Sequence, residues 1–116
     1  MTAPLPRREL GSTGLEVSVL GFGGAAIGNL YRDLADDDAG AAVREAFAAG
    51  VRYFDTAPFY GFGLSEVRLG RALHGAHALP VISTKVGRRL VPTGPQDVSV
   101  GREGYFSPRP FAPVFD

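Results

Sequence analysis

The chain has 116 residues, 45% of them apolar, and its 12 Lys and Arg residues balance its 12 Asp and Glu residues. This composition is typical of part of one globular domain, and the neutral balance gives no electrostatic reason to expect nucleic acid or an anionic membrane as a partner. The sequence contains no cysteine, which excludes a disulfide framework and a thiolate metal site. No segment is apolar for long enough to be a secretion signal or a membrane span. We therefore expect a cytoplasmic protein, without a metal, that binds a small molecule.

The first expected elements are a β-hairpin and a buried strand. Two short runs at residues 7–10 and 15–17 flank a Gly-containing loop, which is the pattern of a hairpin. Residues 17–22 are then β-branched and apolar until Gly23 and Gly24 interrupt the run. This run predicts the first buried strand of a sheet.

Helices and strands are expected to alternate over the next part of the chain. Residues 36–49 carry apolar side chains at helical spacing after three aspartates that are N-cap candidates, and Gly50 stops the pattern. The elements expected after this helix are a strand at 51–55, a loop at 56–64, a helix capped by Ser65 and ended by Gly75, and a strand at 81–85. Such alternation predicts βαβ units, and hence a parallel sheet with right-handed crossovers.

The character of the sequence changes after the third expected strand. From Gly87 onward Gly and Pro are frequent and no helical or strand period is visible. We therefore expect residues 7–92 to hold the structured βα units and residues 93–116 to be a loop or disordered.

The glycine-rich end of the first expected strand permits two interpretations. Residues 21–26 match the G-x-G-x-x-A form of a dinucleotide fingerprint, and Asp55 closes the next strand. That fingerprint requires a helix to begin inside the glycine loop, whereas the first cap signal comes only at Asp36. The favoured interpretation is a tight turn at which Gly23 and Gly24 let a flat ligand approach the backbone.

Asp55, Tyr60 and Lys85 are the residues most suggestive of chemistry. Asp55 and Lys85 each close an expected strand, and Tyr60 follows five residues after Asp55. Residues at the carboxyl ends of the strands of a (β/α) barrel converge on one mouth, so these three side chains are expected to meet.

The three residue types suit proton transfer to a carbonyl. A free tyrosine titrates near pH 10, but an ammonium about 4 Å away stabilises the phenolate by about 4 kcal/mol at an effective dielectric constant near 20. A carboxylate beside the ammonium keeps it charged when it is partly buried. Taken singly, each residue has a structural explanation, namely a turn aspartate, a packed tyrosine and a solvated lysine. His74 and His77 fall at the opposite end of the expected sheet and are interpreted as surface residues.

Several motifs in order resemble the aldo-keto reductase family, and within it the bacterial sugar dehydrogenases and pyridoxal dehydrogenases. They are RELGSTGLEVS at 8–18, LGFGG at 20–24, FDTAPFYG at 54–61 followed by SE at 65–66, and STKVGR at 83–88. The resemblance implies an NADP- or NAD-dependent oxidoreductase on an eight-stranded (β/α)8 barrel, acting on a small carbonyl or sugar substrate. It implies that Asp55, Tyr60 and Lys85 are catalytic, with Tyr60 the general acid or base. It also implies that Gly23, Gly24 and Asp55 lie beside the cofactor.

The chain departs from the family pattern in its extent. The family's catalytic histidine after a fourth strand has no counterpart, and a complete barrel needs about 250 residues or more. We therefore expect an amino-terminal fragment of three βα units, with Val19, Phe54 and Ile82 on the inner face and without partners across the axis. The alternative to an oxidoreductase is a non-catalytic remnant or a weak interaction module.

Overall fold

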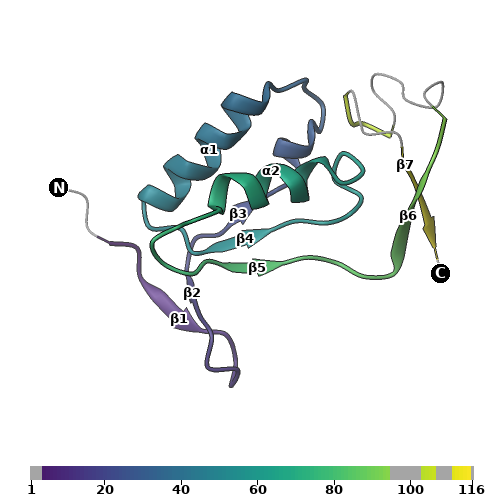
Figure 1. Cartoon of the computed structure of the whole chain (residues 1–116). Coiled ribbons are helices and arrows are strands. Elements are labelled where there is room, and N and C mark those ends of the chain that lie inside the picture. The colour runs from purple at the N-terminus through teal and green to yellow at the C-terminus, as the bar shows by residue number, and fades with distance from the viewer. Residues whose placement is uncertain (1–3, 95–102, 107–110, 116) are drawn as a thin grey trace.

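A small parallel sheet with helices on one face forms the centre of the molecule. The computed structural model describes residues 4–94, 103–106 and 111–115. In this part of the chain the sheet has the order β3 (Phe22–Gly23), β4 (Tyr53–Asp55) and β5 (Val81–Ser83). Helices α1 (Asp36–Ala48) and α2 (Leu64–Leu73) lie side by side over one face of it (Figure 1). The expected alternation of parallel strands and helices is confirmed.

The hydrophobic core lies between the two helices and the sheet. Positions four residues apart on each helix point into it, such as Val43 and Phe47 on α1 and Leu69 and Leu73 on α2. The buried cluster consists of Ile27, Ala39, Val43, Phe47, Val51, Phe54, Leu69 and Leu73. The other face of the sheet carries no helix among the described residues.

Both helices begin differently from the prediction. Ala35 is the N-cap of α1, and the three aspartates occupy its first turn, where their charge still favours the positive end of the helix dipole. Gly63, with φ 93°, is the N-cap of α2. Ser65 is buried inside the first turn, and its hydroxyl donates to the Gly24 carbonyl at 2.7 Å. It therefore ties α2 to the end of β3 instead of capping the helix.

The first predicted strand divides into two elements. Its start belongs to β2 (Glu16–Ser18), which pairs antiparallel with β1 (Arg7–Glu9) and confirms the hairpin. Only Phe22 and Gly23 join the parallel sheet. Val19 donates its amide to the Pro6 carbonyl, which continues the hairpin, and its side chain is exposed. The prediction of one buried strand over residues 17–22 was therefore wrong.

The expected inner-face position of Phe54 was also wrong. Successive side chains of a strand point to opposite faces, so Phe54 and its neighbour Asp55 cannot share a face. Phe54 is fully buried in the core beneath the helices, with its ring centroid 5.6 Å from that of Phe22. Ile82 is the register partner of Phe54 and therefore points to the same face, so its expected inner-face position was wrong too. It lies on the edge strand β5 and is 49% exposed.

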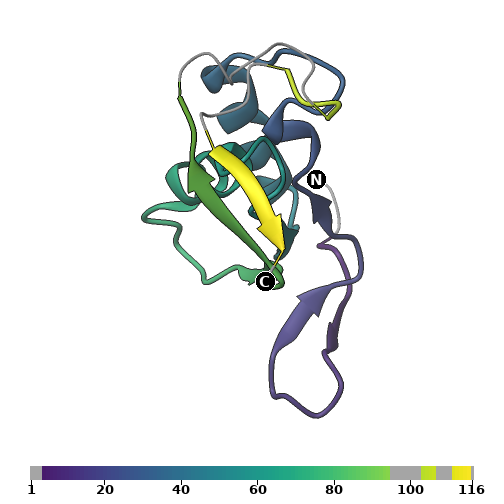
Figure 2. The same cartoon turned by 90° about the vertical axis from the view of Figure 1, so that its right-hand side faces the viewer.

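An antiparallel pair of strands follows the parallel sheet. Strand β6 (Arg88–Pro92) pairs with β7 (Phe111–Phe115), as Figure 2 shows from the side of this pair. A strand thus lies within residues 93–116, where only loop or disorder was expected. The sequence pattern did not indicate this strand because it contains Pro113, and proline is rare inside strands except at sheet edges. Residues 95–102, 107–110 and 116, which share that expectation, lie outside the described residues.

Neither helix of the described residues is long and apolar enough to cross a bilayer.

The difference in burial between Phe54 and Ile82 can be tested by truncation. Phe54→Ala should lower the free energy of unfolding by about 3–5 kcal/mol, because it empties a buried ring site. Ile82→Ala, on a half-exposed side chain, should cost about 1 kcal/mol or less. Urea unfolding followed by circular dichroism measures both, and equal losses would contradict the difference in burial.

Candidate active site

Parallel pairing brings the ends of β4 and β5 to one edge of the sheet. Asp55 is the last residue of β4 and lies opposite Ser83, the last residue of β5. Lys85 follows two residues after β5, and Tyr60 lies in the loop between β4 and α2. All three predicted catalytic residues therefore lie near the carboxyl ends of the strands.

The Lys85 ammonium joins the other two residues of this trio. Its Nζ lies 3.0 Å from Oδ2 and 3.1 Å from Oδ1 of Asp55, and 3.0 Å from the Thr56 carbonyl oxygen. The same Nζ lies 5.0 Å from the centroid of the Tyr60 ring. The structure thus brings the carboxylate, the ammonium and the phenol together, as the sequence predicts.

The Asp55 carboxylate is held in its charged form by two donors. Partial burial alone would raise the pKa of Asp55, but the hydrogen bonds from Ser83 and Lys85 and the Lys85 charge outweigh burial and lower it. The Ser83 hydroxyl donates to Oδ1 at 2.6 Å. The sequence reasoning missed Ser83, although its place two residues before Lys85 was a usable signal.

The Lys85 ammonium is stabilised in turn. The hydrogen bond to Asp55 raises the pKa of Lys85, against the opposing effect of burial, and Tyr60 adds a smaller contribution in the same direction. The side chains are 49% and 38% exposed for Lys85 and Asp55, so solvent screens the pair. Its contribution to folding is therefore about 1 kcal/mol or less, and its significance lies in fixing a cation beside Tyr60.

The Tyr60 loop is set by a close backbone crossing. A Cβ on Gly28 would lie 2.7 Å from the Tyr60 carbonyl carbon, and a Cβ on Gly61 would collide with the Gly28 carbonyl oxygen. Gly61 also has φ 69°, which favours glycine. The two glycines let the chain after β3 support the backbone of Tyr60 directly.

The two glycines at the end of β3 differ in their surroundings. Gly23, the register partner of Asp55, has open space where its Cβ would be. Gly24 is buried, donates its amide to the Asp55 carbonyl at 2.7 Å, and has no room for a Cβ between that oxygen and Ser65. Of these two glycines, only Gly23 therefore leaves room for a ligand at the backbone. Gly24 is packed against the backbone carbonyl of Asp55 in the protein interior.

A cavity of about 240 Å³ opens beside the trio. Its lining includes the Tyr60 ring, Lys85 and the apolar side chains of Phe59 and Val86. The Arg88 guanidinium lies 4.3 Å from the centroid of the Phe59 ring and forms part of the same wall. A small molecule with apolar and polar faces could contact Tyr60 there.

The rival dinucleotide fingerprint does not fit the geometry. A three-residue 3₁₀ turn, η1 (Ala26–Gly28), follows the glycines, and α1 begins only at Asp36. The three parallel strands of the described part of the chain also follow each other in chain order, and this part holds no reversal of the kind at which a doubly wound sheet binds its ligand. His74 and His77 are exposed beyond α2, which confirms their interpretation as surface residues.

Comparison with known proteins agrees with this geometry. The model of the Aldo/keto reductase family matches residues 19–106. The chain belongs to this family. It is 51% identical over 82 residues to D-threo-aldose 1-dehydrogenase from Pseudomonas sp., which covers 70% of this chain and 25% of that protein. It is 48% identical over 85 residues to L-galactose dehydrogenase from Arabidopsis thaliana, covering 70% of this chain and 26% of that protein.

The solved structures confirm the expected fold class. An aldo-keto reductase from Bacillus halodurans, in its holo form, superposes with a TM-score of 0.65 and 36% identity over 73% of this chain and 27% of that chain. The described residues thus correspond to the first βα units of a family barrel and do not close a barrel themselves. The chain spans about a quarter of the length of the relatives it matches.

The role of Ser83 can be tested by removing its hydroxyl. Ser83→Ala should raise the pKa of Asp55, because a hydrogen bond to the charged form is lost. Thr84→Ala is the matched control, since the Thr84 hydroxyl donates to Glu66 and not to Asp55. NMR titration of the Asp55 carboxyl carbon measures both variants.

The sign of the pH effect on stability follows from the same shift. The lowered pKa of Asp55 stabilises the fold above its ordinary value of 3.8, and this contribution is lost as the pH falls through the folded-state pKa. Ser83→Ala should reduce this acid dependence. An unchanged Asp55 titration in Ser83→Ala, or an equal change in Thr84→Ala, would contradict the assignment.

Proposed function

We propose that this chain supplies the proton-transfer part of an NADP- or NAD-dependent oxidoreductase. The enzyme interconverts an aldehyde or ketone and an alcohol, or a sugar hemiacetal and a lactone. The observation that carries the proposal is the Lys85 ammonium, which contacts the Asp55 carboxylate at 3.0 Å and lies 5.0 Å from the Tyr60 ring centroid. A carboxylate, an ammonium and a phenol in this arrangement can move a proton to or from a substrate oxygen.

Each side chain has a distinct role. The Tyr60 phenol donates a proton to the carbonyl oxygen during reduction and accepts it during oxidation. The Lys85 cation stabilises the phenolate that forms when the proton leaves. Asp55 keeps Lys85 charged and in place, and Ser83 orients Asp55 through its hydrogen bond. Asp55 and Lys85 thus act on the substrate through Tyr60.

The described residues fit a nicotinamide cofactor at one point. Gly23 leaves open space at the end of β3 beside Asp55, so a flat ring could approach the backbone there. We assign Gly23 and Asp55 to the cofactor side of the site, with Gly24 supporting Asp55 from within. The cofactor, when bound, supplies or accepts the hydride, and the protein positions it against the substrate carbon.

The substrate we propose is a small carbonyl compound or sugar, acted on in the cytoplasm. The names of the two relatives, D-threo-aldose 1-dehydrogenase and L-galactose dehydrogenase, point to aldose sugars. The cavity beside Tyr60 has an apolar wall in Phe59 and a polar edge in Lys85. A sugar ring offers a hydrophobic face and a hydroxylated edge to such a lining.

A chimera tests the proposal in a complete barrel. The matching stretch of D-threo-aldose 1-dehydrogenase is replaced by that of this chain, and NADH or NADPH formation is measured with D-threo-aldoses and L-galactose. We expect turnover that falls by about 10²- to 10⁴-fold on Tyr60→Phe, because the proton donor is lost. Tyr53→Phe, on the same strand as Asp55 but outside the trio, should retain it.

Two results would contradict this function. The first is a folded chimera that binds the nicotinamide cofactor without turning over, which favours a non-catalytic interaction module. The second is a Tyr60→Phe chimera with undiminished turnover, which removes the proton role of Tyr60.

A further inference from the structure

A short segment far along the chain lies against the loop that follows β3. The Tyr31 amide donates to the Gly104 carbonyl at 2.7 Å, and Leu30 and Tyr105 form an antiparallel bridge. The Phe106 amide donates to the Asn29 carbonyl at 2.9 Å. Residues 104–106 are therefore fixed to this loop by successive backbone contacts.

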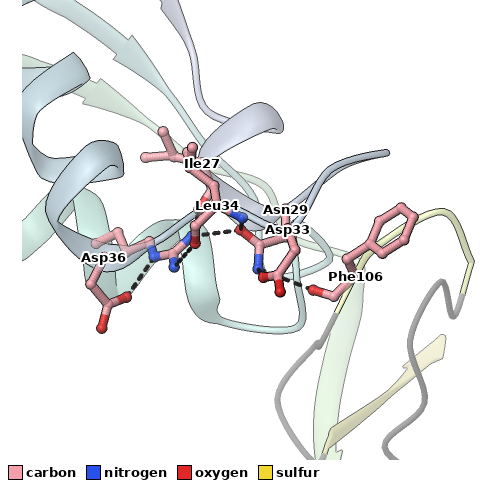
Figure 3. A network of polar contacts seen from close by, with 7 residues as sticks. Ile27, Asn29, Asp33, Leu34, Asp36 and Phe106 are labelled. Carbon is pink, nitrogen blue, oxygen red and sulfur yellow. Dashed lines mark hydrogen bonds and ion pairs between the residues drawn. The ribbon is translucent and has the colours of Figure 1, made fainter.

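The side chain of Asn29 adds a further attachment. Asn29 is buried and has φ 70°, and its Nδ2 donates to the Phe106 carbonyl at 3.1 Å and to Asp33 Oδ1 at 3.2 Å. Its Oδ1 accepts from Arg68 at 2.7 Å and from the Leu34 amide at 3.2 Å. Figure 3 shows Asn29 joined to Phe106, which comes from a separate part of the chain. Every donor and acceptor of the amide is used, so a carboxylate at position 29 would lose both donated bonds.

Arg68 of α2 fixes Asn29 in turn. Its side chain is only 7% exposed, and besides Asn29 it donates to the carbonyls of Ile27 (3.0 Å) and Leu34 (2.6 Å) and to Asp36 (2.9 Å). A buried guanidinium with this many partners holds the loop in one arrangement against α2. Arg68 therefore couples the position of residues 104–106 to helix α2 of the core.

The residue that this network places beside the active site is Tyr105. Its side chain is 3% exposed, and its ring centroid lies 6.5 Å from that of Tyr60 at an interplanar angle of 31°. It also lies 5.6 Å from the Phe59 ring, edge to face at 90°. Burial raises the pKa of Tyr105, and the electrostatic effect of Tyr60 raises it further, so the Tyr105 phenol stays neutral. Tyr105 therefore packs against the proposed proton donor without adding charge.

We propose that Tyr105 is a positioning residue for Tyr60, and that the Arg68–Asn29 network holds it there. Tyr105 restricts the Tyr60 ring on one side while the Lys85 ammonium lies 5.0 Å from its centroid. The catalytic meaning of this contact rests on the proposed function, since small displacements of a reacting group cost large factors in rate. The contact itself does not depend on activity and can be measured directly.

The test uses the whole chain with ¹³Cζ-labelled tyrosine, of which there are four. In the unmodified chain we expect an NOE between the Tyr60 and Tyr105 rings. Asn29→Asp keeps acceptors for Arg68 and Leu34 but removes the side-chain bond to Phe106, so the NOE should weaken and the Tyr60 Cζ resonance should move. Asp33→Ala, which removes only the other partner of Nδ2, is the matched control and should leave both unchanged.

A second pair of variants keeps the test decisive if Asn29→Asp fails to fold. Tyr105→Leu should move the Tyr60 resonance as Asn29→Asp does, and Tyr105→Phe should restore it, because the ring and not the hydroxyl makes the contact. A Tyr60 resonance that is unmoved in Tyr105→Leu would overturn the proposal. Lys85→Met separates the two ideas: it should move the Tyr60 resonance and keep the NOE. An unmoved resonance there would count against the proposed function alone.

Discussion

The pairing of two neighbouring parallel strands is the constraint on which the rest of this structure depends. Because β4 and β5 pair in a fixed register, Asp55 lies opposite Ser83. Lys85 follows Ser83 by two residues, and its ammonium reaches the Asp55 carboxylate. A carboxylate held by a hydroxyl and an ammonium stays charged, and it keeps the ammonium charged beside Tyr60. The pair contributes little to stability at its exposure, so its effect is to fix one positive charge at one place.

Buried polar contacts behind this pair make its surroundings rigid. The Ser65 hydroxyl joins α2 to the Gly24 carbonyl, and the Gly24 amide joins β3 to the backbone of Asp55. Arg68 joins α2 in the same way to the loop that supports Tyr60 and Tyr105, through its hydrogen bonds to Ile27 and Asn29. The core under the helices holds the elements together, while these contacts set the relative positions of the reacting groups.

The sequence predicted what local patterns determine, namely the hairpin, the alternation of strands and helices, and the convergence of Asp55, Tyr60 and Lys85. It failed where position depends on contacts distant in the chain. Strand β7 needs β6 as a partner, and Tyr105 lies near Tyr60 because residues 104–106 pair with the loop around Asn29. The face of Phe54, by contrast, follows from strand alternation once Asp55 is placed at the mouth, so that error was avoidable. Ser65 looked like a helix cap because a capping serine and a serine that binds a distant carbonyl are identical in sequence.

The most direct test of the central claim is the titration of the Lys85 ammonium, followed by NMR of its labelled Cε in the unmodified chain and in Asp55→Asn. The ion pair predicts a pKa above the ordinary value of 10.5 in the unmodified chain, because Asp55 stabilises the cation. Asp55→Asn should lower it. A Lys85 pKa that is not raised, or that does not respond to Asp55→Asn, would contradict the account.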